Sequence, residues 1–504
     1  MSVMQRTAAI LGILVALIAL AVAISSLGAF LPGPRGPLNI IVISIDSLRQ
    51  DHMSLYGYER ATTPFIDAWA HDAAVFENYY ATSFLTPISE MSVQTGRYPF
   101  TNGVVNFGAP LAHGVPTLAE ILKGQGYETA AFLSSPEFSS YPSLQSAASR
   151  GFDTFEPATD ATDRFHGRGI DVPQKAVDWL RIGRAKDEPF FLWLAIGTAH
   201  WPYGQDEPNH FSDPSYAGVM TKTRFPGWPL YGSIYDGVWY GAAGEYAGEV
   251  VPEDFAYVRG RYDDGLVKTD RLLETLFAYL RKTGLDRTTV VVLQSEHGES
   301  LGERGYVAHY DIHDEEVHVP LIVKAPGVEA SRIAAVASGV DIVPTVLDLA
   351  NAAPVETDGV SLVPALESPV SPRTEAYMAR IPLWEGVVGS PRIAEQIEGL
   401  PTGEVLRQYD TAVRGGPYKL IHRSARAYLR THSWWSKLTG TPLRYPEYEL
   451  YDINVDPGET RNLYPVMAED SRIVALRDNL ARWEAQMQTL FPTVSAPASL
   501  QPYF

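Results

Sequence analysis

Acidic and imidazole side chains follow three apolar runs that are candidates for buried strands. Asp46 directly follows the first run, His200 comes shortly after a second, and Glu296 and His297 follow a third. In α/β sheets, ligands bind at the edge where the carboxyl ends of the strands meet. Two carboxylates with a neutral imidazole suit Zn²⁺ or Mn²⁺, whereas oxygen ligands alone would suit Ca²⁺ or Mg²⁺ better. These residues predict a site for one divalent metal ion, with Zn²⁺ or Mn²⁺ favoured and Ca²⁺ or Mg²⁺ as alternatives.

Most of the chain alternates short apolar, β-branched runs with helical patterns. The runs that predict strands are residues 39–45, 130–133, 190–196, 289–293 and 320–323. Helical patterns between them cover residues 116–124, 172–182 and 263–282. Apolar runs of this kind are typical of strands buried on both faces. The alternation predicts an α/β fold, with a doubly wound, mostly parallel central sheet flanked by helices.

The pattern changes after about residue 365, where scattered strands with turn residues lead to a helix near residues 470–488. This change predicts a smaller C-terminal α+β subdomain over residues 366–504. The main α/β domain is expected to cover residues 38–365. The first 37 residues form a separate N-terminal segment with its linker.

Composition excludes several classes of protein. The chain has 504 residues, and 40 Lys+Arg against 59 Asp+Glu give a net charge of −19. Nucleic-acid binding needs a basic face, so we expect no nucleic-acid partner. The chain has no cysteine. Disulfides, thiolate zinc sites, iron–sulfur clusters and a cysteine nucleophile are therefore excluded.

The N-terminal segment is strongly apolar. Residues 8–30 carry no charge and exceed the roughly 20 residues that a helix needs to cross a membrane. This length favours an uncleaved transmembrane anchor, and a cleaved signal peptide is the alternative. In either case we expect the rest of the chain outside the cytoplasm, in the periplasm or the extracellular space, and secreted if the segment is cleaved.

Short motifs stand in a characteristic order over residues 39–485. They are residues 39–52 (NIIVISIDSLRQDH), 56–58 (YGY), 63–67 (TPFID), 95–99 (TGRYP), 126–130 (GYETA), 199–202 (AHWP), 295–299 (SEHGE), 319–322 (VPLI), 341–345 (DIVPT), 449–452 (ELYD) and 456–463 (DPGETRNL). In this order they resemble the sulfatase family of the alkaline-phosphatase superfamily. The resemblance implies an alkaline-phosphatase-like catalytic domain and a metal-dependent hydrolase or transferase that acts on an anionic ester.

The residue at the family's nucleophile position is Thr86, ten residues before Gly96. Formylglycine-dependent sulfatases have Cys or Ser at this position. The surrounding sequence also departs from the family, because its proline is displaced to Pro87 and Glu90 replaces a basic residue. A threonine ester lacks the diol through which formylglycine eliminates sulfate, so it must be released by attack at the central atom. That reaction is ordinary for a phosphoryl group, and Thr86 therefore favours phosphoryl transfer over sulfate hydrolysis.

The resemblance also implies a metal-ligand set. Its members are Asp46, Thr86, Glu296 and His297, with Glu296 in place of the more usual Asp. A divalent ion lowers the pKa of a bound hydroxyl, so Thr86 could act as a nucleophile near neutral pH.

Further residues match family positions that contact the substrate. His200 and His309 correspond to residues that contact the ester or protonate the leaving group, and His313 is the alternative to His309. Arg49 follows Asp46 and could orient Asp46 or bind the substrate anion, with an ion pair to Asp51 as the alternative.

Two segments rich in aromatic residues are candidates for contacts with partners. Residues 201–250 could form a lid over the substrate or pack onto the domain. Residues 426–437 mix basic and aromatic side chains, which suits a membrane interface, a surface helix or a protein contact.

The leading interpretation is a membrane-anchored, extracytoplasmic hydrolase or transferase that cleaves a phosphoester through Thr86. A lipid head group is one candidate substrate. Two alternatives stay open. The first is a sulfuric ester hydrolase, or sulfatase, that works without formylglycine. The second is a catalytically degenerate family member that serves as a structural or partner-binding subunit of a membrane assembly.

Overall fold

The computed structural model of the chain describes most of residues 36–490. Within this range, the described residues exclude 107, 159–170, 186–187, 202, 205–206, 219, 221–222, 226–227, 230–250, 306, 310, 369, 381–408 and 424–445. The described residues from Leu38 onward belong to one compact unit. Across the part of the chain that is described, no helix has both the length and the apolar character needed to span a membrane. The predicted anchor at residues 8–30 lies outside the described residues.

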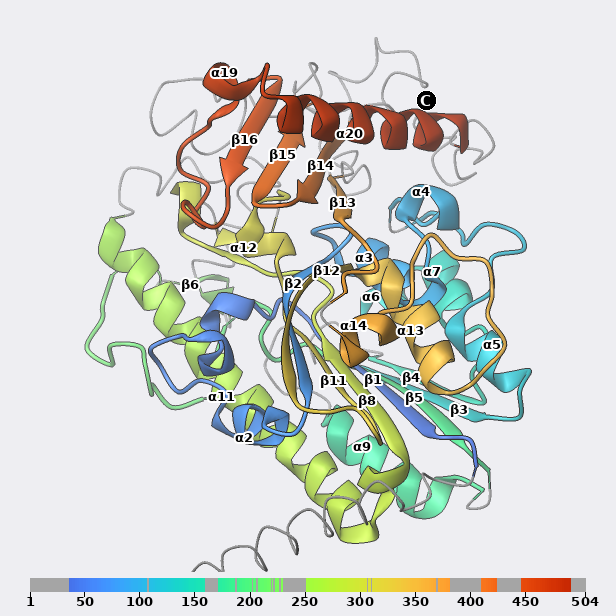
Figure 1. Ribbon diagram of the computed structural model, residues 1–504. Helices are drawn as coiled ribbons and strands as arrows, with labels where there is room; N and C mark the ends of the chain where they lie inside the picture. Colours follow the sequence, from blue (N-terminus) through green and yellow to red (C-terminus); the bar gives the residue numbers. More distant parts are fainter. Residues whose placement is uncertain are drawn as a thin grey trace, which may run out of the picture. The chain divides into compact units, whose positions relative to one another are not determined.

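An eight-stranded sheet forms the centre of the described residues (Figure 1). Its order is β12 (Ser331–Ser338), β2 (Ala74–Tyr80), β11 (Leu321–Lys324), β8 (Thr289–Gln294), β1 (Asn39–Ile45), β5 (Phe190–Ile196), β3 (Glu128–Leu133) and β4 (Thr154–Pro157). β11 runs antiparallel to both neighbours, and the other pairs recorded in this sheet are parallel. The sheet is therefore mostly parallel, as predicted. The strand predicted at residues 320–323 corresponds to β11, the antiparallel member of the sheet, and burial on both faces does not reveal strand direction.

Predicted strands coincide best where the sequence is continuously apolar. Residues 39–45 and 190–196 match β1 and β5 in full, and every residue of these strands is buried. β2 and β12 were not predicted. Glu77 interrupts the apolar run of β2, and β12 mixes small residues with exposed ones. Tertiary pairing therefore decides these strands more than local composition does.

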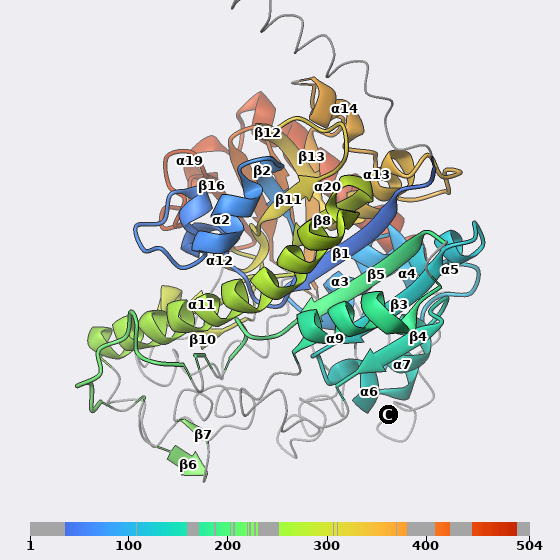
Figure 2. The same ribbon diagram turned by 90° about the horizontal axis from the view of Figure 1, so that it is seen from below.

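Helices cover both faces of the sheet (Figures 1 and 2). Successive side chains of a strand point to opposite faces, so Ile40 and Val42 of β1 join one core while Ile41 and Ile43 join the other. The first core includes residues from α3 (Thr86–Thr95), α5 (Leu118–Lys123), α7 (Pro142–Ala148) and α13 (Ile342–Leu349). The second includes residues from α2 (Pro64–Ala70), α9 (Val172–Asp178) and α11 (Pro252–Thr283). The layers are those of a doubly wound α/β fold.

α11 is longer than its apolar pattern predicted. The helix begins at Pro252 rather than at residue 263. Proline suits the first helical turn, and the Asp254 carboxylate accepts a hydrogen bond from the Val251 backbone N–H at 2.6 Å. These N-terminal signals were present in a stretch whose apolar periodicity is weak.

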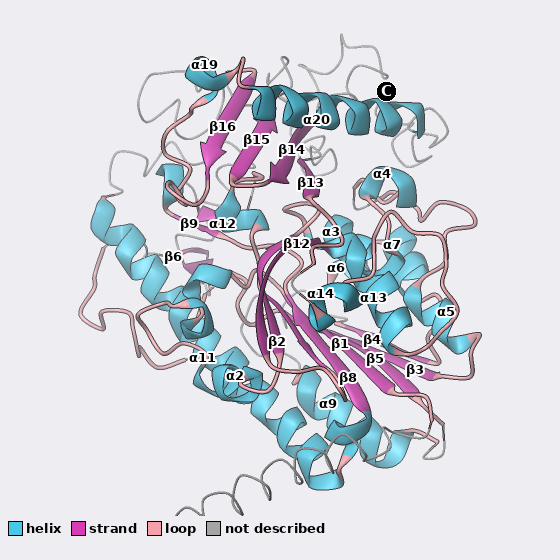
Figure 3. Cartoon of the chain, in the orientation of Figure 1, coloured by secondary structure: helices cyan, strands magenta, loops and turns pink. Residues whose placement is uncertain are grey.

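A separate antiparallel sheet carries the C-terminal part of the chain (Figure 3). Its strands are β13 (Glu375–Arg380), β14 (Asp410–Gly415), β15 (Tyr418–His422) and β16 (Tyr448–Asp452). α20 (Ser471–Leu490) packs on it through apolar residues that include Leu476 and Trp483. The predicted helix at 470–488 is thus confirmed. The domain boundary at residue 365 stays a prediction.

The segment between β8 and β11 contains much of the predicted site. A short hairpin of β9 (Ser300–Leu301) and β10 (Val307–Ala308) pairs antiparallel, and α12 (Asp314–Val317) follows it. The loops of this segment lie at the carboxyl end of β8, beside the ends of β1 and β5 in the sheet.

Candidate active site and metal centre

Thr86 lies at the first position of α3, and only 3% of its surface is exposed. Pro87 occupies the next position, where proline needs no backbone donor. The N-terminus of a helix carries a partial positive charge that favours negative charge nearby. The fold therefore sets the Thr86 hydroxyl where an oxyanion is electrostatically favoured.

Asp46, Glu296 and His297, here called the first ligand group, meet beside Thr86. Each offers one ligand atom, and these three atoms lie within 4.8 Å of one another. His297 Nε2 is 3.0 Å from Thr86 Oγ1 and 3.5 Å from Asp46 Oδ1. All four side chains are buried. The structure therefore brings together the four residues expected to bind the metal.

A hydrogen bond of Nδ1 orients the His297 ring. Nδ1 lies 2.9 Å from the carbonyl oxygen of Gly298, and a carbonyl only accepts, so Nδ1 carries the proton. Nε2 then faces Thr86 Oγ1 and Asp46 Oδ1. Gly298 permits this turn, because a Cβ at its position would collide with the Glu315 carbonyl oxygen.

Carboxyl groups are concentrated around this site. Burial raises the pKa of Glu90 to about 7, and Asp46 adds to the rise. Burial, followed by Asp46 and Glu90, raises the pKa of Glu296 well above its usual range. Glu296 Oε2 is buried with no hydrogen-bond partner among the described residues. A buried oxygen without a donor, next to an imidazole lone pair and further carboxylates, fits a divalent cation.

Two residues beside the predicted site have an unusual backbone conformation. Ser47, directly after Asp46, has φ 63°, and Ala308, directly before His309, has φ 79°. This left-handed region is uncommon for residues other than glycine, and such conformations cluster at functional sites. Neither backbone conformation was predicted from the sequence.

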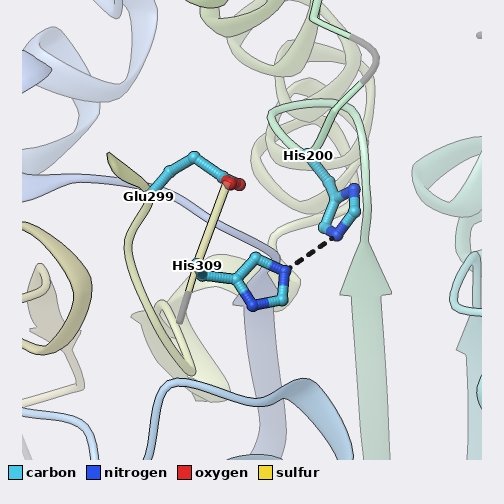
Figure 4. Close-up of side chains that lie close together, drawn as sticks. All are labelled: His200, Glu299 and His309. Atoms are coloured by element: carbon cyan, nitrogen blue, oxygen red, sulfur yellow. Dashed lines mark hydrogen bonds between the residues drawn. The ribbon is translucent and has the colours of Figure 1, made fainter. Parts of the chain in front are cut away.

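A second ligand group, formed by His200, Glu299 and His309, adjoins the first (Figure 4). One ligand atom from each lies within 4.8 Å of the others, and all three side chains are buried. The rings of His309 and His297 have their centroids 4.2 Å apart. His200 and His309 thus converge beside the first ligand group. Glu299 was not singled out from the sequence.

The guanidinium of Arg49 is bound by acidic neighbours. Its nitrogens lie 2.7 Å from Asp51 Oδ2 and 2.8 Å from Glu303 Oε1, and NH1 also donates to the Glu299 carbonyl oxygen. The ion pair with Asp51, one of the two alternatives, is what the structure contains. The expected binding of a substrate anion by Arg49 gains no support, because four of its five N–H donors are engaged in these contacts.

His313, the alternative to His309, lies in a different environment. Its Nε2 is 3.3 Å from an Arg423 nitrogen and 3.4 Å from Glu449 Oε2. The geometry therefore favours His309 as the member of the site.

Little of the two aromatic segments is described. Trp201 and Tyr203 are buried in the core that packs against α11, which agrees with packing onto the domain. Residues 230–250 and the whole of 426–437 lie outside the described residues, so the predicted lid and interface stay predictions.

Comparisons with known proteins agree with this fold. The Sulfatase family model matches residues 38–352. The chain is 25% identical over 462 residues to a Delta 4,5-hexuronate-2-O-sulfatase of Bacteroides thetaiotaomicron, covering 84% of each chain. It is 24% identical over 374 residues to arylsulfatase K of Gallus gallus, covering 67% of this chain and 69% of the relative.

A solved structure supports the fold. The phosphonate monoester hydrolase of Agrobacterium radiobacter superposes with a TM-score of 0.66 at 20% sequence identity, covering 89% of this chain and 96% of that one. The chain belongs to the sulfatase family, because the family model covers more than half of it. It is accordingly a hydrolase-type enzyme with the alkaline-phosphatase-like fold of that family.

Proposed function

We propose that this enzyme cleaves a phosphoester by nucleophilic attack of Thr86, with a divalent ion held by Asp46, Thr86, Glu296 and His297. The observation that carries the proposal is the 3.0 Å contact between Thr86 Oγ1 and His297 Nε2, within reach of Asp46. This contact places Thr86 Oγ1 and His297 Nε2 close enough to share one ion with Asp46, and metal coordination is one way in which a hydroxyl nucleophile is activated.

The bound ion would supply charge neutralisation for an anionic ester and a lowered pKa for the Thr86 hydroxyl. The chain's own groups supply orientation. The Gly298 carbonyl oxygen accepts a hydrogen bond from His297 Nδ1 and orients the ring, and the first position of α3 holds the Thr86 hydroxyl. In-line attack by Thr86 Oγ1 on phosphorus would expel the leaving alcohol and leave a phospho-threonine. Attack of water or an acceptor alcohol on phosphorus would then restore the hydroxyl.

His200 and His309 are proposed to face the leaving group. Their Nε2 atoms are 3.3 Å apart, and the His309 ring lies against that of His297.

A sulfate ester is the second candidate substrate. It is favoured by the relatives, among them the named hexuronate-2-O-sulfatase. The absence of cysteine and the presence of threonine at position 86 weigh against it, because the formylglycine route is closed.

We further propose that the enzyme works outside the cytoplasm, anchored by residues 8–30 or secreted after their cleavage. The charge-free length of this segment supports the proposal. An anchored enzyme would reach esters at the membrane surface, and a lipid head group is therefore one candidate substrate.

The test compares turnover of an aryl phosphodiester, an aryl phosphomonoester and an aryl sulfate by the full chain with added Zn²⁺ or Mn²⁺. We expect a phosphoester to be cleaved fastest. Preference for the sulfate would contradict the argument from Thr86. Absence of turnover with all three, in protein that retains its metal, would favour the partner-binding alternative.

A further inference from the structure

The second ligand group is assembled from separate segments of the chain. His200 follows β5, whereas Glu299 and His309 flank the two strands of the β9–β10 hairpin. Ala308 pairs with Ser300 in that hairpin, so the next residues outward, His309 and Glu299, lie at the same end of it. At most 4% of each of the three ligand-type residues is exposed. The hairpin register therefore holds two of the three ligands, and the sheet holds the third.

The imidazole nitrogens are oriented as metal ligands are. His200 Nδ1 lies 2.6 Å from the Trp201 carbonyl oxygen and must donate to it, so Nε2 presents a lone pair to the group. Histidine ligands are usually fixed through their other ring nitrogen in this way. Nε2 of His200 and Nε2 of His309 are 3.3 Å apart. This separation matches the edge of a tetrahedral zinc site, about 3.3–3.4 Å for Zn–N bonds of about 2.0–2.1 Å.

We propose that His200, Glu299 and His309 bind a second divalent cation, of the zinc type, next to the first ligand group. Two histidines and one glutamate form a ligand set of catalytic zinc sites, in which a fourth position stays open for water or substrate. The Glu299 carboxylate and both rings approach the same space in Figure 4.

The catalytic meaning of this site rests on the proposed function. Two-metal hydrolytic sites hold their ions about 3.5–4 Å apart and stabilise the attacking and leaving oxygens together. The ring centroids of His297 and His309 are 4.2 Å apart, so the two ligand groups are immediate neighbours. The second cation would neutralise charge on the leaving oxygen, so His200 and His309 would act as ligands and not as proton donors.

The direct test is zinc stoichiometry. The full-length chain, solubilised if anchored, is stripped with chelator, reloaded with ZnCl₂, freed of excess zinc and analysed for zinc per chain. We expect about two zinc ions in the wild type and about one in Glu299→Gln and in His309→Ala. His71→Ala changes an exposed histidine outside both groups and is expected to keep the wild-type content. Circular dichroism and the melting temperature of each variant establish that it is folded.

The proposal is overturned if the wild type binds a single zinc, or if Glu299→Gln and His309→Ala bind as much zinc as the wild type. Loss of turnover in His309→Ala with full zinc content would assign that residue to proton donation or ester contact instead. Glu299→Gln preserves the shape of the side chain, so the test survives misfolding of the alanine variant.

The outcome separates this site from the first one. Asp46→Ala is expected to lose one zinc ion and all turnover, whereas Glu299→Gln loses the other ion. Normal turnover in Asp46→Ala would contradict the proposed function and leave the second site standing. Unchanged zinc content in Glu299→Gln, together with an inactive Asp46→Ala, would contradict the second site and leave the proposed function standing.

Discussion

Two buried sets of charged side chains differ in how their charge is balanced. Around the first ligand group, burial raises the pKa of Glu90 to about 7 and that of Glu296 well above its usual range, with neighbouring carboxylates adding to both. The other set joins α12 to the C-terminal sheet and is here called the junction cluster. Its members are Asp314, Lys419, Arg423, Glu449 and Glu459. There Lys419 Nζ lies 2.6 Å from Asp314 Oδ1 and 3.1 Å from Glu459 Oε1.

The junction cluster contains its own cations. Burial acts to raise the pKa of Asp314, but Lys419 overcomes it and holds this pKa below its usual range. Arg423 Nε lies 2.7 Å from Glu449 Oε1 and lowers the pKa of that carboxyl against the same effect of burial. Equal burial thus has opposite consequences. Paired carboxylates are structural, whereas carboxylates gathered with each other and with an imidazole are suited to an added cation.

The largest expected effect is a loss of catalysis when Thr86 of α3 is replaced, compared with a second threonine of the same helix. Thr86→Ala should lower kcat by about 10³-fold or more, because it removes the attacking oxygen. Thr95→Ala, on the same helix with its hydroxyl 2.6 Å from the Met91 carbonyl oxygen, should keep activity within a few-fold. Steady-state kinetics with the preferred ester measure both. Equal losses in the two variants would mean that Thr86 acts only through the fold.

The next effect concerns the junction cluster. Lys419→Met leaves two buried carboxylates without their cation and should lower the free energy of unfolding by about 3–5 kcal/mol. Lys175→Met removes the half-exposed pair with Glu156 and should cost about 1 kcal/mol or less. Urea unfolding monitored by circular dichroism compares them. Similar costs would show that burial does not distinguish the junction cluster from a surface pair.

Metal removal should act on the first ligand group and spare the junction cluster. A cation at 100 times its Kd stabilises the folded state by about 2.7 kcal/mol, so chelation should lower the Tm of the wild type. The double variant Asp46→Ala, Glu299→Gln should respond little, because it lacks a ligand from each group. A melting temperature unaffected by chelator in the wild type, in protein shown to have contained metal, would contradict this reading.

The smallest effect is a pH dependence of opposite sign in the two sets. Folding raises the pKa of Glu90 from its ordinary value of 4.5 to about 7. The free energy of unfolding of the metal-free protein should therefore fall as pH rises through this interval. Asp314 and Glu449 have lowered pKa values, so their contribution is present above their ordinary values and lost as pH falls below them. Urea unfolding of chelated Glu90→Gln should show a weaker loss between pH 4.5 and 7. If the free energy of unfolding of Glu90→Gln depends on pH as steeply as that of the wild type, Glu90 is not the cause of the loss.

Sequence predicted the parts of the molecule that local composition determines. The strands β1 and β5 are continuously apolar, and Asp46 stands directly after one of them. The carboxyl ends of neighbouring strands in one sheet lie close together, and this rule predicts that Asp46, Glu296 and His297 converge. The position of Thr86 came from the family resemblance.

Long-range pairing decided what sequence did not predict. Glu299 joins His309 through the register of a two-residue hairpin, and no local pattern specifies that register. Arg49 has Glu303 as a partner 254 residues away, a contact that periodicity does not reveal. The left-handed conformation of Ala308 is likewise imposed by tertiary structure.

Attack of Thr86 on the ester would leave a covalent adduct on this residue, and peptide mass spectrometry after rapid acid quench can detect it. The full chain is mixed with the preferred aryl phosphoester for less than one turnover, quenched and digested. The account predicts a phosphoryl adduct on the peptide that contains Thr86, absent in Thr86→Ala and present in Thr95→Ala. Active protein that carries the adduct on another residue, or turns over with no adduct in single-turnover samples, would contradict it.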